Sequence, residues 1–203
     1  KYVTYHPYQP EQSTTTGDDG IKSSTSITNT LETTSVQATK LWSNDAVGSV
    51  EDAWGTRPAN GNNNWTVTYF LQQRLEGAGD DAWTWVVEAG AESATSAADD
   101  GVISFTISNG LTGDENHVVT KNDDGSVTVT WKNLPECSED GTLYEYRLVE
   151  QVPGSYDVKD AQQVEDTDTA HRYYVATSTV GTGDNPDSQS FNNELRTVDL
   201  SGT

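Results

Sequence analysis

Short segments in which apolar and polar residues alternate, separated by polar turns, constrain this chain more than any other feature of its sequence. A period of two is typical of a strand that buries one face, and spacings of roughly 8–12 residues are typical of a sandwich. Asn122-Asp123-Asp124-Gly125 is a strong hairpin turn, because glycine supplies the positive φ that such turns need. The pattern predicts an all-β, antiparallel sandwich. Strands are expected at 35–43, 64–73, 82–88, 102–108, 117–121, 126–132, 142–151, 172–179 and 189–198.

Three of these segments place a polar residue where the alternation points into the core. The residues are Lys40 in segment 36–42, Glu150 at the end of segment 144–150, and Asn193 in segment 191–195. Such side chains are seldom buried unless they are paired or hydrogen-bonded, so we expect them to meet inside the sandwich. Together they carry the groups for an amide bond between Lys40 and Asn193, assisted by the Glu150 carboxyl. The alternative is a non-covalent polar cluster of the same three residues.

Charge and cysteine content exclude several classes of function. The formal net charge of −21 argues against nucleic acid and anionic membrane surfaces as partners, since both require clusters of Lys and Arg. No apolar run approaches the ~20 residues of a membrane helix, and no signal peptide is present, so we expect a mature fragment of a longer, exposed surface protein. The lone Cys137 excludes an intrachain disulfide framework. It has no histidine in a related context, so a hydrolase is not favoured.

The two ends of the chain resemble each other. Tyr2-Val3-Thr4 and the later segment 26–33 correspond to Tyr174-Val175-Ala176 and segment 190–197, with Asn29 opposite Asn193. This similarity predicts a tandem array. Residues 1–33 would be the closing hairpin of a preceding repeat, and residues 34–203 a complete repeat with an inserted hairpin at about 77–125. Chance similarity between two hairpins rich in Thr and Ser is the alternative.

Five motifs follow one another in a specific order along the chain. They are Thr39-Lys40-Leu41-Trp42, Thr56-Arg57-Pro58 with the strand 65–71, Val127 through Pro135, Tyr144 through Glu150 with Val152-Pro153-Gly154-Ser155-Tyr156, and Phe191-Asn192-Asn193. In this order they resemble a B-type domain of the Cna collagen-adhesin family, found in stalks, pilins and adhesins of Gram-positive surface proteins. The resemblance covers about residues 34–200. Asn192-Asn193 departs from the usual Thr-Asn of the closing strand, and alternation alone selects Asn193.

The resemblance implies an immunoglobulin-like Greek-key sandwich and a structural stalk or shaft domain in the extracellular space, at the cell wall or cell surface. It also implies an autocatalytic Lys40–Asn193 isopeptide bond with Glu150 assisting. That reaction occurs once per molecule, so the domain is not an enzyme in the turnover sense, and it needs no cofactor or metal. The implied partners are neighbouring repeats, with other copies in a fibre as a further option. In this reading Asn29 is the crosslink residue of the preceding repeat, either unreacted or bonded to a lysine of another molecule.

Several other features carry alternative interpretations. Trp83 and Trp85 share one strand face in the inserted region. Packing in the core or between the sheets is the role that we favour for them. Binding of a host glycan or protein through this region is the main rival function. Aspartate- and asparagine-rich turns supply oxygen atoms suited to calcium, without the spacing of an EF-hand loop. They lie at 17–20, 122–125 and 184–187. Asn64-Trp65-Thr66 is a glycosylation sequon whose use depends on the source.

Overall fold

The computed structural model describes residues 8–16, 23–57, 65–110, 113–152, 157–158, 163–165, 174–180 and 188–196. In this part of the chain the fold is almost entirely β, which confirms the expected class; the helical element is one 3-10 turn, η1 (Asp80–Ala82). The strands are β1 (Tyr8–Thr16), β2 (Ser23–Leu31), β3 (Thr33–Ser43), β4 (Thr66–Leu75), β5 (Thr84–Trp85), β6 (Ser104–Ser108), β7 (His117–Lys121), β8 (Val127–Pro135), β9 (Tyr144–Val152), β10 (Asp157–Val158), β11 (Gln163–Glu165), β12 (Tyr174–Val180) and β13 (Ser188–Leu195).

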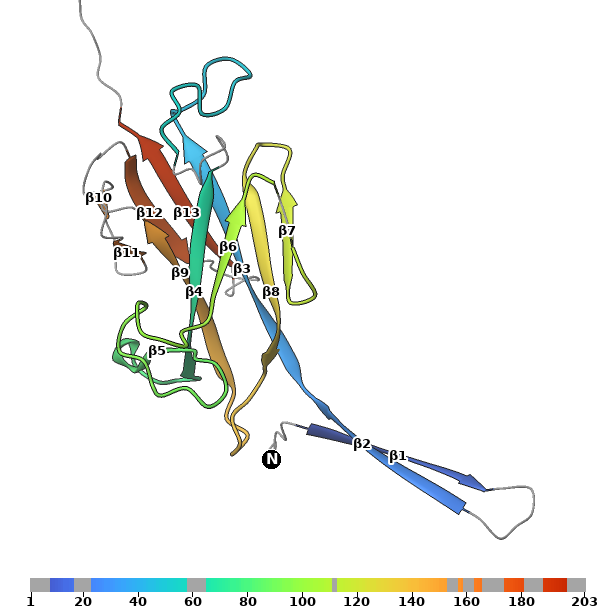
Figure 1. Ribbon diagram of the computed structural model, residues 1–203. Helices are drawn as coiled ribbons and strands as arrows, with labels where there is room; N and C mark the ends of the chain where they lie inside the picture. The colour runs from blue at the N-terminus through green and yellow to red at the C-terminus, as the bar shows by residue number, and fades with distance from the viewer. Residues whose placement is uncertain are drawn as a thin grey trace, which may run out of the picture.

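Two sheets enclose the core (Figure 1). One has the strand order β10-β12-β13-β3-β8-β7, and the other has the order β11-β9-β4-β5, with β6 also paired to β4. Apolar side chains from the inner faces of both sheets pack into one cluster. Its fully buried members include Val36, Ala38, Tyr69, Leu71, Ile107, Val129, Leu148 and Phe191.

The expectation of an antiparallel sandwich holds only in part, because three of the strand pairs among the described residues are parallel. β13 runs parallel to β3, β10 to β12, and β11 to β9. A parallel pair needs a long connection between its strands. For β3 and β13 that connection is nearly the whole sandwich, since they are its first and last strands.

The region 77–125 adds strands to both sheets. β6 pairs antiparallel with β4, and β7 pairs antiparallel with β8. The expected strand at 82–88 is reduced to β5, and η1 forms the turn just before it. Two short strands, β10 and β11, lie between the expected strands 142–151 and 172–179, where the sequence pattern predicted none.

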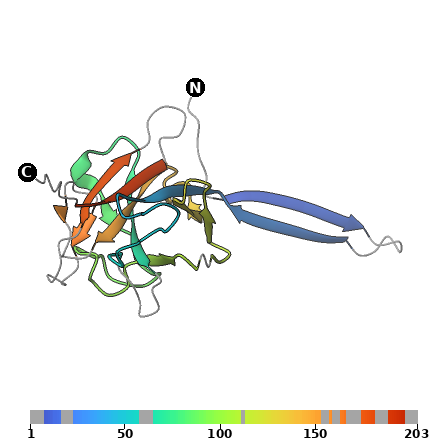
Figure 2. The ribbon, with the colours of Figure 1, turned by 90° about the horizontal axis from the view of Figure 1, so that it is seen from above.

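A second, separate ribbon precedes the sandwich. β1 and β2 form a two-stranded antiparallel sheet that projects away from the body (Figure 2). Only Glu32 separates the end of β2 from the start of β3. The ribbon therefore leads into the first strand of the sandwich with almost no linker.

Among the described residues, no helix has the length and apolar character to cross a membrane.

Candidate functional site

Lys40 lies near the end of β3, on the face that points into the core. Its neighbours two and four residues earlier, Ala38 and Val36, are fully buried on the same face, as the alternation requires. Lys40 is itself 1% exposed, and its Nζ lies 4.7 Å from the centroid of the Trp42 ring. Burial lowers the pKa of Lys40 to about 8, against the opposing attraction of Glu150. The amine is therefore far easier to deprotonate than an ordinary lysine.

Glu150 reaches the same point from the opposite sheet. It lies on β9, opposite Tyr69 of β4, and is 1% exposed. Its Oε1 accepts a hydrogen bond from Lys40 Nζ at 2.6 Å and a second from Asn193 Nδ2 at 3.3 Å. One carboxyl oxygen thus contacts both the amine and the amide.

Asn193 lies on β13, which is hydrogen-bonded to both β12 and β3. In the parallel register Phe191 lies opposite Lys40 and Asn193 opposite Trp42, so Lys40 and Asn193 are diagonal neighbours on one face. Asn193 is 1% exposed, and within the described part of the chain its Oδ1 is buried with no hydrogen-bond partner. The preceding Asn192 points to the other face, where its Oδ1 accepts from Ser43 Oγ at 2.7 Å.

Aromatic rings surround the three polar groups. Tyr69 and Phe191 pack at 5.3 Å between ring centroids, and Trp42 packs against Trp65 at 5.8 Å. Burial raises the pKa of Tyr69, with a further contribution from the charge of Glu150. The three polar groups therefore lie in an apolar part of the core, where an unpaired charge is costly.

A buried ion pair between Arg57 and Asp45 lies next to Trp42. The sequence patterns did not predict this pair. Arg57 donates from Nε to Asp45 Oδ2 at 2.6 Å and from Nη2 to Asp45 Oδ1 at 2.9 Å, and the Tyr174 hydroxyl donates to Asp45 Oδ2 at 2.9 Å. The guanidinium carbon of Arg57 lies 5.1 Å from the Trp42 ring centroid. The Arg-Pro motif signalled Arg57, but no pattern marked Asp45, because it follows the strand in an irregular loop.

Asn29, the predicted crosslink residue of the preceding repeat, lies in β2. Its backbone pairs with Pro10 in the β1–β2 ribbon. The side chain of Asn29 lies outside the described residues, as do Asn64 and the turns at 17–20 and 184–187. Its proposed role stays a prediction.

The aromatic residues of the rival, ligand-binding interpretation are engaged within the protein. Two guanidinium groups lie over the Trp83 ring, with the Cζ of Arg74 at 4.5 Å and that of Arg147 at 4.4 Å from its centroid. Trp85 packs edge-on against Phe70 at 6.1 Å. A sugar that stacked on Trp83 would compete with these arginines.

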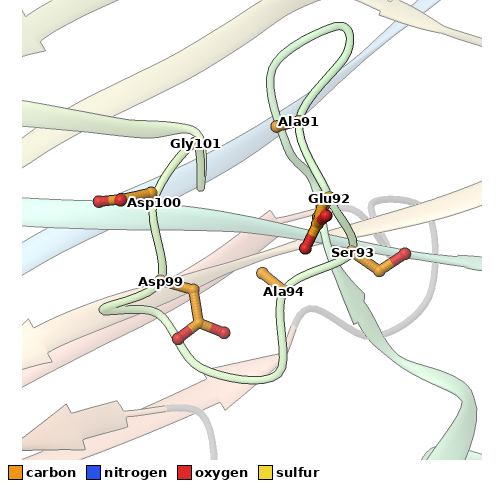
Figure 3. A pocket seen from close by; sticks show the side chains of 7 residues that line it. All are labelled: Ala91, Glu92, Ser93, Ala94, Asp99, Asp100 and Gly101. Atoms are coloured by element: carbon orange, nitrogen blue, oxygen red, sulfur yellow. The ribbon is translucent and has the colours of Figure 1, made fainter.

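A shallow hollow lies nearby in the same region (Figure 3). It is lined by Ala91–Ala94 and Asp99–Gly101 and has a volume of about 430 Å³. The Asp99 carboxylate already accepts hydrogen bonds from the backbone of Thr95 and Ser96, and these bonds lower its pKa. No group of three or more His, Cys, Asp or Glu side chains suited to a metal occurs among the described residues. In the turn at 122–125, Asp124 Oδ1 instead accepts from Ser126.

Comparison with models of known families, with curated proteins and with solved structures finds no match to this chain. The functional interpretation therefore depends on the chemistry of the site formed by Lys40, Glu150 and Asn193.

Proposed function

We propose that this chain is part of a structural stalk or shaft of a cell-surface adhesin or pilus-like protein, and that an intramolecular amide bond between Lys40 and Asn193 crosslinks it. The observation that carries the proposal is the contact of three buried side chains, Lys40, Glu150 and Asn193, on three different strands. Two of these strands are the first and last of the sandwich. A bond between them would close the fold covalently.

The reaction begins with proton transfer from Lys40 Nζ to Glu150 Oε1 across their 2.6 Å hydrogen bond. The lowered pKa of Lys40 makes the neutral amine accessible, and a carboxylic acid is stable in an apolar site. Rotation of the Asn193 amide then presents Oδ1, which has no partner within the described residues, to the protonated carboxyl. A hydrogen bond from that acid polarises the carbonyl toward attack.

The bond exchange is balanced without any further reactant. Nζ of Lys40 attacks Cγ of Asn193, so an N–C bond forms, and the bond from Cγ to Nδ2 breaks. Glu150 passes a proton to the departing nitrogen, which leaves as ammonia, and takes one from Nζ. Contact between the partners supplies the high effective concentration that makes amide exchange feasible. The product is stable, so the domain reacts once and does not turn over.

The backbone register of the two hairpins supports a tandem arrangement, but with Tyr8 in place of the predicted Tyr2 as the residue equivalent to Tyr174. The segment Tyr2-Val3-Thr4 itself lies outside the described residues. Tyr8 pairs with Leu31, two positions before Pro10 pairs with Asn29. In the sandwich, Tyr174 pairs with Leu195, two positions before Ala176 pairs with Asn193. Each hairpin therefore has a Tyr opposite a Leu and a small or cyclic residue opposite an Asn. We interpret the β1–β2 ribbon as the closing hairpin of a preceding repeat and the sandwich as an immunoglobulin-like domain of the Cna B type.

The intact mass of the purified chain tests the proposal. Wild type should be about 17 Da below its sequence mass, the mass of one ammonia, whereas Lys40→Ala should have its full sequence mass. Peptide mapping should recover one branched peptide that joins Lys40 to Asn193. A wild-type chain at full sequence mass would reduce the three residues to a non-covalent polar cluster.

A further inference from the structure

Gln189 makes an unusual link between the two sheets. It lies on β13, four residues before Asn193 on the same inward face, and is 4% exposed. Its side-chain Oε1 accepts from the backbone N–H of Leu148 at 2.5 Å, and its Nε2 donates to the backbone carbonyl of Leu148 at 3.0 Å. One side-chain amide thus satisfies both polar backbone groups of a residue in the opposite sheet.

The backbone of Leu148 is open to this contact because of its place in β9. Leu148 lies opposite Leu71 of β4, but the Leu71 backbone bonds instead to Ile103 and Val86. In an antiparallel ladder such a pair directs its N–H and C=O groups away from each other. On the far side of β9, the pairing with β11 that the described residues show begins at Glu150. Gln189 fills the position that a backbone partner would otherwise take, and a buried backbone group needs such a partner.

The Gln189 contact and the reactive contact lie on the same two strands. On β13 the inward residues include Gln189, Phe191 and Asn193, and on β9 they include Leu148 and Glu150. Gln189 binds Leu148, and Asn193 binds Glu150. Hydrogen bonds to β12 and β3 already fix β13 beside Lys40, but they do not fix β9 relative to β13.

We propose that Gln189 is a positioning residue for crosslink formation: its amide sets the register between β9 and β13 and thereby holds Glu150 against both Lys40 and Asn193. This inference rests on the proposed amide bond. Gln189 touches neither reacting group in the mechanism and acts only through the placement of the acid. Displacement of a catalytic group by about 1 Å can cost about 100-fold in rate, so the effect should be measurable.

The rate of ammonia loss during refolding tests this role. The full chain is recovered from inclusion bodies in denaturant, where it is unfolded, and is then diluted into buffer so that it refolds. Samples are quenched at intervals, and their intact mass is measured. Gln189→Leu should slow the reaction about 10- to 100-fold. Gln72→Leu is the matched control, because Gln72 is also a buried strand glutamine but accepts from Arg147 away from the site. It should react at the wild-type rate.

Gln189→Glu separates positioning from general destabilisation. A protonated Glu can donate to the Leu148 carbonyl and accept from its N–H, as Gln does, whereas an ionised Glu can only accept. The rate of Gln189→Glu relative to wild type at the same pH should therefore rise as the pH falls from about 7 to about 5. This readout stays decisive if Gln189→Leu fails to fold.

The outcomes distinguish the two proposals. If wild type loses ammonia and Gln189→Leu reacts as fast as wild type, the role of Gln189 is overturned while the crosslink stands. The role of Gln189 is also overturned if the rate of Gln189→Glu, divided by the wild-type rate at the same pH, does not change with pH. If wild type itself keeps its full mass, the proposed function fails, and the positioning role fails with it.

Discussion

Replacing Lys40 by Met and Glu150 by Gln in one chain should lower the free energy of unfolding by about 5 kcal/mol relative to wild type. The double change removes the nucleophile but leaves no unpaired charge in the core, because the two groups pair with each other at 2.6 Å. Exchange of a buried ion pair for uncharged residues of similar volume is often close to neutral. The difference should therefore report mainly the covalent bond.

The magnitude follows from the length of chain that the bond would enclose. Lys40 and Asn193 are separated by about 150 residues, which is most of the sandwich. In the chain-entropy model a crosslink over about 150 residues removes about 17 cal/mol/K from the unfolded state, or about 5 kcal/mol at 25 °C. This is a large share of the stability of an ordinary domain.

Urea unfolding followed by tryptophan fluorescence measures the difference. With an m-value of about 3 kcal/mol/M, the midpoint should fall by about 1.7 M, and wild type should show the smaller m-value because its unfolded state is more compact. Lys121→Met with Glu51→Gln is the matched control, since that pair is half-exposed at 3.4 Å. It should cost less than about 1 kcal/mol. If mass spectrometry shows that wild type is crosslinked but the free energy of unfolding of the core variant is less than about 1 kcal/mol below that of wild type, this result refutes the entropy argument.

Three further predictions concern the same region. Glu150→Gln should keep its full sequence mass by mass spectrometry, because no acid remains to move protons; a loss of about 17 Da would exclude the assisting role. Asn193→Ala keeps Lys40 unreacted, so Lys40 can still titrate. The pKa of Lys40 is about 8 in the folded state and 10.5 in the unfolded state, so between pH 8 and 10.5 the unfolded state binds one proton more than the folded state. The free energy of unfolding of Asn193→Ala should therefore rise by about 3 kcal/mol from pH 8 to 10.5, relative to that of the double variant Asn193→Ala with Lys40→Met. If urea unfolding finds the same difference in stability between the two variants at both pH values, the prediction is contradicted. Arg57→Ala should cost about 3–5 kcal/mol in urea unfolding, because it leaves Asp45 buried without its cation; a cost below about 1 kcal/mol would contradict it.

Local patterns in the sequence predicted most strands and the inward position of each polar residue. The turn at Asn122–Gly125 is confirmed: Gly125 has a φ of 83°, and Asn122 N–H donates to the Ser126 carbonyl at 2.8 Å. Alternation also separated Asn193, which is buried, from Asn192, which bonds to Ser43 on the other face. These features depend only on neighbours in the chain, so periodicity can report them.

Pairing between distant strands was not predictable in the same way. Nothing in the alternation specifies that β13 lies parallel to β3, because period two fixes the face of a residue but not the partner of a strand. The links made by Gln189 and Asp45 were missed for a related reason. Gln189 bonds to backbone atoms in the other sheet, and Asp45 lies in a loop, so neither stands out by residue type.

The parallel pairing of β3 and β13 has a mechanical consequence of its own. The chain enters β3 beside the β1–β2 ribbon and leaves β13 at the opposite end of the sandwich (Figure 1). Tension along the chain would therefore slide these two strands past each other lengthwise. The two strands pair at seven positions, from Ser188↔Gln37 to Glu194↔Ser43. Under this shear the hydrogen bonds at all seven positions would be loaded together, and they would not break one after another from one end.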